Sequence, residues 1–269
     1  MRLYPFFCLI AIFSIGFPRL AEAVSPERLS EEEIRLADSS VKALDPLIAD
    51  RKVKGTAPLI TFEELYAPLA PKQADFLDSI RRLNPDELGG SNKRLPTPSS
   101  DDQFIRLDTQ RILRDEKPTP LDPQYLPWPV YEAYGRMMSA MEQELGKRLL
   151  VESGYRSPAY QLYLFLFYMP KHGYSIRETN RFVALPGFSE HGSPKRQAID
   201  FITPAGINGE DRPEEFEELQ EYGWLRARAH EFGFHLSYPR GGQSAFEPWH
   251  WHWEETPALQ TRRYADERS

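Results

Sequence analysis

Two stretches in the second half of the chain combine residue types that can bind a metal ion and activate water. The first, residues 185–201, reads LPGFSEHGSPKRQAIDF, and the second, residues 247–252, reads EPWHWH. Between them they contain two histidines and two carboxylates with suitable spacing: His191, Asp200, Glu247 and His250. A catalytic zinc ion usually has three protein ligands and one open position for water, and a nearby carboxylate can take a proton from that water. These residue types therefore predict a zinc hydrolase.

Histidines and tryptophans alternate in the second stretch. If residues 249–253 form a strand, His250 and His252 face one way and the tryptophans face the other. His250 lies three residues after Glu247 and His252 lies five after it, so either imidazole could bind the metal on spacing alone. The alternative is a stacked aromatic edge whose histidines point into solvent.

Three polar residues stand where a strand ends or a helix begins. Residues 198–201 have the apolar alternation of a strand end, which would direct Asp200 into a site. Arg156 lies in the sequence SGYRS, between a predicted strand at residues 148–152 and a helix that follows. A guanidinium there could hold a substrate carboxylate by two parallel hydrogen bonds, although an ordinary surface ion pair is the alternative. Gln161, one helical turn later, could line the same cleft.

The elements around this junction follow clear apolar patterns. The helix predicted before it has one apolar stripe, formed by Val130, Tyr134, Met137, Met141 and Leu145. Gly146 is placed to end this helix. The helix after the junction is rich in tyrosine and phenylalanine, so we expect it to be well buried.

The first 23 residues have the composition of an export signal. Arg2 supplies a positive charge, residues 3–17 are almost wholly apolar, and residues 20–23 offer the small side chains of a cleavage site. An uncleaved N-terminal anchor is the alternative. The single cysteine, Cys8, would be removed with this segment, which would leave a mature chain without disulfides. We therefore expect export across the inner membrane into an oxidising compartment such as a bacterial periplasm.

Residues 24–120 are predicted to form a mostly helical N-terminal extension, to which the sequence assigns no chemistry. Pro46 is expected to interrupt its first helical stretch. Thr61 and Glu64 resemble a capping box, and Pro71 could begin a further helix. We interpret the extension as a docking or covering segment.

Two stretches lack a periodic pattern. Residues 89–103 have the composition of a linker. Residues 117–129 contain five prolines, which indicates an extended strap rather than a regular element. The predicted organisation is a signal peptide at residues 1–23, the extension at 24–120 and a catalytic domain at 121–262.

The overall charge argues against some classes of partner. The formal net charge is −7, and no run of lysine and arginine stands out, so we expect no nucleic-acid partner. No stretch beyond the signal is apolar enough to cross a membrane.

Taken together, four pieces of the sequence resemble the zinc D-Ala-D-Ala carboxypeptidases of the VanY type, in the lysostaphin/D-Ala-D-Ala metallopeptidase group. The pieces, in the family's order, are SGYRS at 153–157, LPGFSEH at 185–191, AID at 198–200 and EPWH at 247–250. The resemblance covers roughly residues 125–255 and does not extend to the N-terminal region.

This resemblance implies a role for each matching residue. The zinc ligands would be His191, Asp200 and His250. Glu247 would be the general base that activates water, and Arg156 would bind the substrate's terminal carboxylate or steady the developing oxyanion. The family cleaves the terminal D-alanine from peptidoglycan stem peptides, so these peptides are the expected substrate.

Two further residues are candidates for contact with the substrate. Ser189 lies within the LPGFSEH piece. His252 is outside the core motif, and we interpret it as a cleft residue that stabilises the reaction or supports a ligand.

The sequence departs from the family in one loop. The family pattern S-x-H-x-x-G-x-A-x-D brings the aspartate closer to the histidine, whereas Asp200 lies nine residues after His191, two more than in that pattern. Residues 192–197 therefore resemble a lengthened loop. Its Lys195 and Arg196 could alter access to the site or the choice of substrate.

The resemblance also implies the fold, an α+β domain in which helices surround a small antiparallel sheet that carries the zinc site. The expected function is a secreted zinc carboxypeptidase that trims D-alanine from cell-wall peptides. An L,D-carboxypeptidase or an endopeptidase of the same wall is an alternative. A catalytically silent wall-binding protein is another, although a pure binding module has no use for a base beside the metal.

Overall fold

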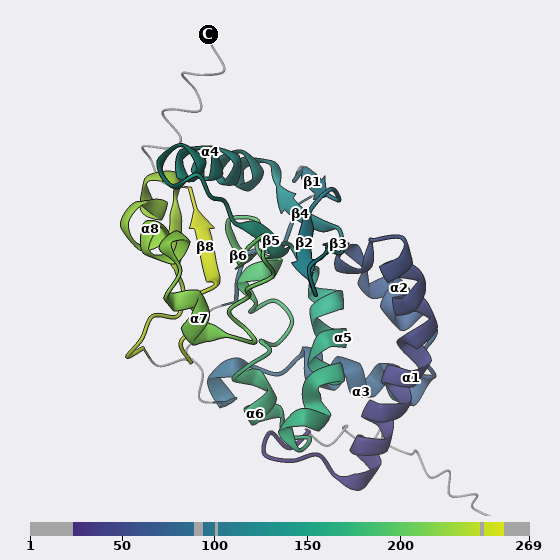
Figure 1. Cartoon of the computed structure of the whole chain (residues 1–269). Helices are drawn as coiled ribbons and strands as arrows, with labels where there is room; N and C mark the ends of the chain where they lie inside the picture. Colours follow the sequence, from purple (N-terminus) through teal and green to yellow (C-terminus); the bar gives the residue numbers. More distant parts are fainter. Residues whose placement is uncertain (1–23, 89–93, 100–101, 243–244, 256–269) are drawn as a thin grey trace, which may run out of the picture.

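A computed structural model describes residues 24–88, 94–99, 102–242 and 245–255 of the chain. The predicted signal peptide and the predicted domain end at residue 262 lie outside the described residues. Within these ranges, no helix has the length and apolar character that crossing a membrane requires. The architecture is mixed α and β, with a helical N-terminal region and small antiparallel sheets (Figure 1).

The described part of the N-terminal region contains three α-helices. They are α1 (Glu31–Val53), α2 (Phe62–Tyr66) and α3 (Pro71–Arg81). Thr61 and Glu64 form the predicted capping box at the start of α2, and Pro71 begins α3 as expected. The expected break at Pro46 is absent, because α1 continues through it. Pro46 and Lys42 are both exposed, so the Lys42 carbonyl that lacks a helical donor can be hydrated instead.

The proline-rich segment is more regular than expected. It contributes to two short antiparallel ribbons, in which β1 (Phe104–Leu107) pairs with β4 (Gln124–Pro127) and β2 (Arg111–Arg114) pairs with β3 (Lys117–Pro120). Proline is tolerated in such isolated ribbons because each strand has an edge that needs no amide donor.

The remaining described elements include five α-helices and four strands. The helices are α4 (Trp128–Leu145), α5 (Pro158–Tyr168), α6 (Ile176–Asn180), α7 (Pro213–Glu217) and α8 (Gln220–Arg228). The strands are β5 (Leu150–Ser153), β6 (Arg196–Ile202), β7 (Phe234–Leu236) and β8 (His250–Glu254). The predicted stripe of α4 is buried except for Leu145, which is partly buried, and Gly146 ends the helix in a left-handed conformation with φ of 66°.

The four strands form one antiparallel sheet in the order β5-β6-β8-β7. One face is apolar and packs with α4 and α8 in a core that includes Ile199, Phe201, Trp251 and Trp253. Since side chains alternate along a strand, Asp200, His250 and His252 project from the opposite face. This alternation directs the chemically interesting residues away from the core.

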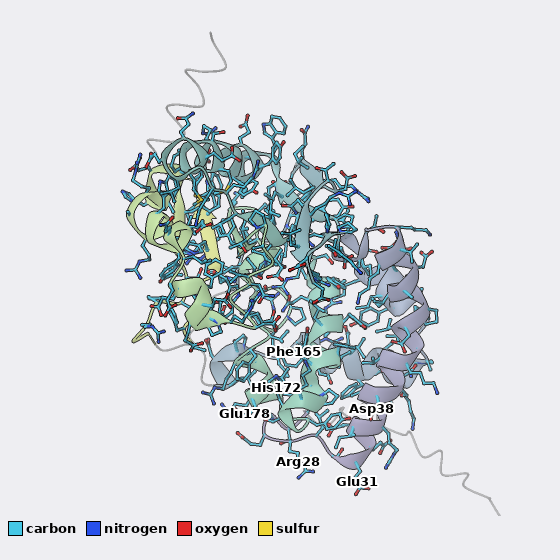
Figure 2. All side chains as sticks on the ribbon, viewed as in Figure 1. Arg28, Glu31, Asp38, Phe165, His172 and Glu178 are labelled. Atoms are coloured by element: carbon cyan, nitrogen blue, oxygen red, sulfur yellow. The ribbon has the colours of Figure 1, made fainter. Side chains whose placement is uncertain are left out.

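A second core joins the N-terminal helices to the rest of the molecule. It combines Leu44 of α1 and Leu77 of α3 with Phe165 of α5 and Leu185. In Figure 1, α5 lies between α1 and the part that holds the sheet, and Figure 2 shows Phe165 in the interior. The described part of the N-terminal region is therefore packed into the fold.

Candidate metal centre

The three predicted ligands come together at one place on the polar face of the sheet. Asp200 on β6 is directly paired with His250 on β8, and His191 approaches from a short 3-10 turn, Glu190–Gly192. His191 Nε2 lies 3.1 Å from Asp200 Oδ2, and His250 Nδ1 lies 2.8 Å from Asp200 Oδ1. One ligand atom from each of the three residues lies within 4.8 Å of the others. The group contains His250 and not His252, so the geometry favours His250 of the two imidazoles that spacing allowed.

The ring of His191 is oriented by the turn that carries Arg156. His191 Nδ1 lies 2.8 Å from the carbonyl oxygen of Gly154, so Nδ1–H donates to this oxygen. Nε2 is buried and has no hydrogen bond of acceptable geometry in the described structure. Gly154 is required here because a Cβ would lie 2.4 Å from the backbone oxygen of Tyr125. His191 thus presents a free Nε2 lone pair toward Asp200.

The ring of His250 lies between two carboxylates. In addition to the contact with Asp200, its Nε2 lies 3.0 Å from Glu190 Oε2. A hydrogen bond from Nε2–H to Glu190 leaves the Nδ1 lone pair on the side of Asp200 and His191. This is the arrangement in which a carboxylate fixes the tautomer of a metal-binding histidine.

The electrostatics of the group fit a cation. Burial alone would raise the pKa of Asp200, but the neighbouring His191 and His250 hold it well below its ordinary value. Burial and the Arg156 charge lower the pKa of His191 to about 4, so this imidazole is neutral at pH 7. A buried set of one carboxylate and two imidazoles with an orphaned nitrogen is a donor set that zinc accepts.

Glu247 lies beside the cluster. Its Oε2 is 3.9 Å from His250 Nδ1, on the side of the ring that faces Asp200. Burial raises the pKa of Glu247 to about 7, with the charge of Asp200 adding to the increase and His250 opposing it. A carboxyl group with a pKa near neutrality can accept and return a proton at physiological pH.

Arg156 is joined to His191 by a hydrogen bond between their backbones. Its backbone N–H donates to the carbonyl oxygen of His191 at 2.9 Å, and its Nε is buried without a hydrogen-bond partner in the described structure. Its charge lowers the pKa of both His191 and Glu247, so the guanidinium faces the cluster. The side chain also lines a pocket of about 200 Å³.

The other predicted contact residues differ in their environment. Ser189 is buried and directly precedes the 3-10 turn. Gln161 is also buried, donates from Nε2 to the carbonyl oxygen of Ala184 at 2.8 Å and is not among the residues that line the pocket beside Arg156. His252 lies 2.7 Å from Ser237 Oγ through its Nδ1, two pairs along the strands from His250.

Glu190 is the residue of this site to which the sequence assigned no role. Besides His250, it contacts Ser237, whose hydroxyl donates to Oε2 at 2.6 Å, and Arg196, whose Nε donates to Oε1 at 2.7 Å. Burial alone would raise the pKa of Glu190, but the hydrogen bonds from His250 and Ser237 and the charges of His250 and His252 hold it well below its ordinary value. The only signal in the sequence was its position next to His191.

The lengthened loop, residues 192–197, brings Arg196 into two ion pairs. Arg196, at the start of β6, pairs with Glu190 and with Glu254 of β8, whereas Lys195 is exposed. The contacts of Arg196 tie the loop to Glu190, the carboxylate that holds His250.

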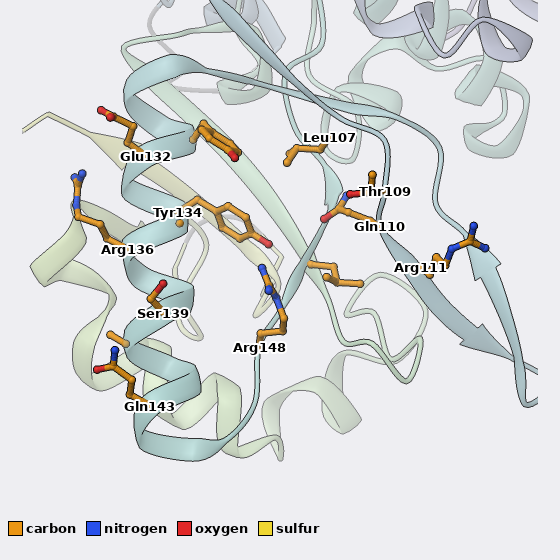
Figure 3. A pocket seen from close by; sticks show the side chains of 14 residues that line it. Leu107, Thr109, Gln110, Arg111, Glu132, Tyr134, Arg136, Ser139, Gln143 and Arg148 are labelled. Carbon is orange, nitrogen blue, oxygen red and sulfur yellow. The ribbon is translucent and has the colours of Figure 1, made fainter.

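A larger hollow of about 830 Å³ lies elsewhere, between α4 and the segment around β1 and β2 (Figure 3). Gln110 and Tyr134 lie near Arg148 there, and Gln110 pairs its amide with the backbone of Val151 at the edge of β5. None of the metal-centre residues lines this hollow, so size alone does not identify the candidate active site.

Comparison with known proteins places this geometry in context. Residues 124–256 match the family model described as VanY: D-alanyl-D-alanine carboxypeptidase. The putative carboxypeptidase YodJ of Bacillus subtilis (strain 168) is 28% identical over 185 residues, which are 66% of this chain and 63% of YodJ. The chain thus spans slightly less than two thirds of the length of this relative.

Two solved structures illustrate the similarity in fold. The LdcB LD-carboxypeptidase matches with a TM-score of 0.48 and 24% identity, over 68% of this chain and 84% of LdcB. A mutant of the vancomycin-resistance D,D-pentapeptidase VanY in complex with Zn(II) matches with a TM-score of 0.43 and 20% identity, over 64% of this chain and 90% of the other.

Proposed function

Residues 124–256 form a domain of the VanY carboxypeptidase family, and from this premise we propose a zinc-dependent D,D-carboxypeptidase that removes the terminal D-alanine from peptidoglycan stem peptides. The observation that supports the proposal most strongly is the buried group of His191, Asp200 and His250 with Glu247 beside it. The composition of residues 1–23 supports export, which would bring the enzyme to the cell wall.

Zinc held by His191, Asp200 and His250 would polarise the scissile carbonyl and make a water molecule a good nucleophile near neutral pH. Glu247 accepts the proton that the attacking water loses and passes it to the nitrogen of the departing D-alanine. Its raised pKa, about 7, suits both transfers.

Arg156 supplies the positive charge that a carboxypeptidase requires. Its guanidinium can bind the substrate's terminal carboxylate by two hydrogen bonds, or steady the negative charge that develops on the carbonyl oxygen. The lack of a partner for its buried Nε leaves donor capacity for such a ligand.

Incubation with muropeptides of defined stem length, followed by mass spectrometry, tests this proposal. A D,D-carboxypeptidase converts pentapeptide stems to tetrapeptide stems by loss of one alanine. Loss of the terminal residue from tetrapeptide stems would instead identify an L,D-carboxypeptidase, and cleavage of cross-links an endopeptidase. Zinc-loaded protein that releases nothing from any stem would support the silent wall-binding alternative.

A further inference from the structure

The last turn of α1 and the segment that joins it to α2 form one wall of the pocket beside Arg156. Lys52, Gly55, Ala57 and Pro58 line this pocket together with Arg156, which lies just before α5. These four residues precede the part of the chain that matches the VanY family model, residues 124–256. The pocket that Arg156 lines is therefore completed by the N-terminal region.

This wall is fixed to the turn that carries Arg156. The backbone N–H of Ser157 donates to the carbonyl oxygen of Pro58 at 2.8 Å, and the Ser157 hydroxyl donates to the carbonyl oxygen of Ile60 at 2.6 Å. The hydroxyl of Tyr125 donates to the carbonyl oxygen of Gly55 at 2.9 Å. Because the contacts flank both ends of the wall, its position relative to Arg156 is well defined.

The backbone of the wall also leaves no room for change at Gly55. This residue has φ of 66°, and an added Cβ would lie 2.5 Å from the Pro123 ring. The close approach of the backbone at Gly55 to Pro123 thus requires glycine at this position. The sequence therefore keeps these two walls of the pocket close together.

The lining favours a small residue with a free carboxylate. Arg156 and Lys52 contribute two positive charges, against one negative charge from Asp122. Ala57 and Pro58 offer a short apolar surface. The volume of about 200 Å³ lies below the roughly 300–1,000 Å³ typical of sites for drug-sized ligands. A single small amino acid matches both the charge and the size.

We propose that residues 52–58 form the subsite for the C-terminal residue of the substrate, which is a small amino acid with a free α-carboxylate. Lys52 adds its charge to that of Arg156, and Ala57 limits the size of the side chain that enters. This inference rests on the proposed carboxypeptidase function and assigns a specificity-determining role to the N-terminal region.

Charge reversal at Lys52 tests the electrostatic part. Lys52→Glu is compared with Lys54→Glu, which makes the same change two residues away at a side chain that bonds Asp50 and does not line the pocket. For a pentapeptide with a free C-terminus, Lys52→Glu is expected to raise KM about three- to tenfold with kcat little changed, as suits a partly exposed charge pair. Lys54→Glu should behave like the wild type, and the amidated peptide should show no difference between the variants.

Widening the wall tests the size limit. Ala57→Gly is expected to raise the ratio of kcat/KM for a peptide ending in D-leucine to kcat/KM for one ending in D-alanine by about tenfold. A difference of one methylene group in an apolar pocket changes kcat/KM by at least about this factor. Zinc content and the thermal unfolding midpoint, measured for each variant, show that the fold and the metal centre are intact.

The outcomes distinguish this inference from the function on which it rests. If the wild type is active but Lys52→Glu matches Lys54→Glu and Ala57→Gly leaves the substrate ratio unchanged, the wall does not contact the terminal residue and the inference is wrong. If the zinc-loaded wild type releases no terminal residue from any peptide, the proposed function itself fails.

Discussion

The Nε2 atom of His250 lies 3.0 Å from Oε2 of Glu190, while Nδ1 of the same ring faces Asp200. This contact makes Glu190 a positioning residue, because it fixes which nitrogen of His250 is free for a metal. Glu190→Ala is expected to weaken zinc binding by about 10- to 100-fold, the range typical for loss of such a partner. Competition with a chromogenic chelator measures the affinity.

Glu254→Ala is the matched control for this prediction. Glu254 shares the Arg196 guanidinium with Glu190, but in the described structure its carboxylate lies near His252 and not His250, so zinc affinity should stay close to that of the wild type. The visible spectrum of the cobalt-substituted protein gives a second readout, since a displaced imidazole alters the ligand field. Equal affinities and identical spectra for Glu190→Ala and wild type would show that Glu190 does not position His250.

Replacement of Glu247 should separate metal binding from hydrolysis. Glu247→Gln removes the proton acceptor but none of the three proposed ligands, so we expect retention of zinc and a decrease in kcat of about 10²- to 10⁴-fold. His250→Ala should lose both zinc and activity. Stopped assays with a pentapeptide and metal analysis of the same samples measure the two properties. Full activity in Glu247→Gln would mean that another group is the base.

The same substitution has a predicted effect on stability. Burial raises the pKa of Glu247 from 4.5 to about 7 in the folded chain. The unfolded chain therefore ionises first as the pH rises, so this carboxyl lowers the free energy of unfolding progressively from pH 4.5 upward, and fully above pH 7. In chelator-treated protein, Glu247→Gln should raise the melting temperature at pH 8 and leave it unchanged at pH 4. A similar change at both pH values would indicate an effect of packing instead.

Metal binding should compete with protons at His250. Burial lowers the pKa of this ring, but the charge of Asp200 and the hydrogen bonds to Asp200 and Glu190 outweigh burial and raise the pKa to about 10. At pH 7 the metal-free ring is therefore protonated and must lose a proton to bind zinc, so the affinity should increase as the pH rises toward 10.

Calorimetry in buffers with different ionisation enthalpies counts the protons released by zinc. The Glu247→Gln variant is the best background, because it removes a second group that titrates near pH 7. About one proton per zinc is expected at pH 7. Binding without any proton release would contradict the assignment of His250 as a ligand.

The alternation of polar and apolar residues along the sequence correctly predicted the strands that carry the site. The alternation at His250 and His252 identified β8, and the apolar alternation around Asp200 identified β6. Glu190 was missed because its role depends on the pairing of strands that are 50 residues apart, which brings His250 beside Asp200. Nothing in the spacing from His191 indicates that Glu190 turns toward the same ring.

Contacts between segments that are distant in the sequence explain other features that the sequence did not predict. The wall formed by Lys52 and Ala57 reaches Arg156 only through the packing of α1 and α2 on α5, which no local pattern encodes. Gln161 fits a helical face next to the cleft in sequence, but that face is buried against the loop at Ala184. Pro46 was expected to break a helix, yet its exposed position allows α1 to continue.

Zinc stoichiometry measured together with activity tests the account most directly. The purified protein should bind about one zinc ion per chain, lose hydrolysis of pentapeptide stems when a chelator removes that ion, and regain it on addition of one equivalent of zinc. Hydrolysis that persists after complete removal of metal would contradict the central claim that His191, Asp200 and His250 hold the ion on which the reaction depends.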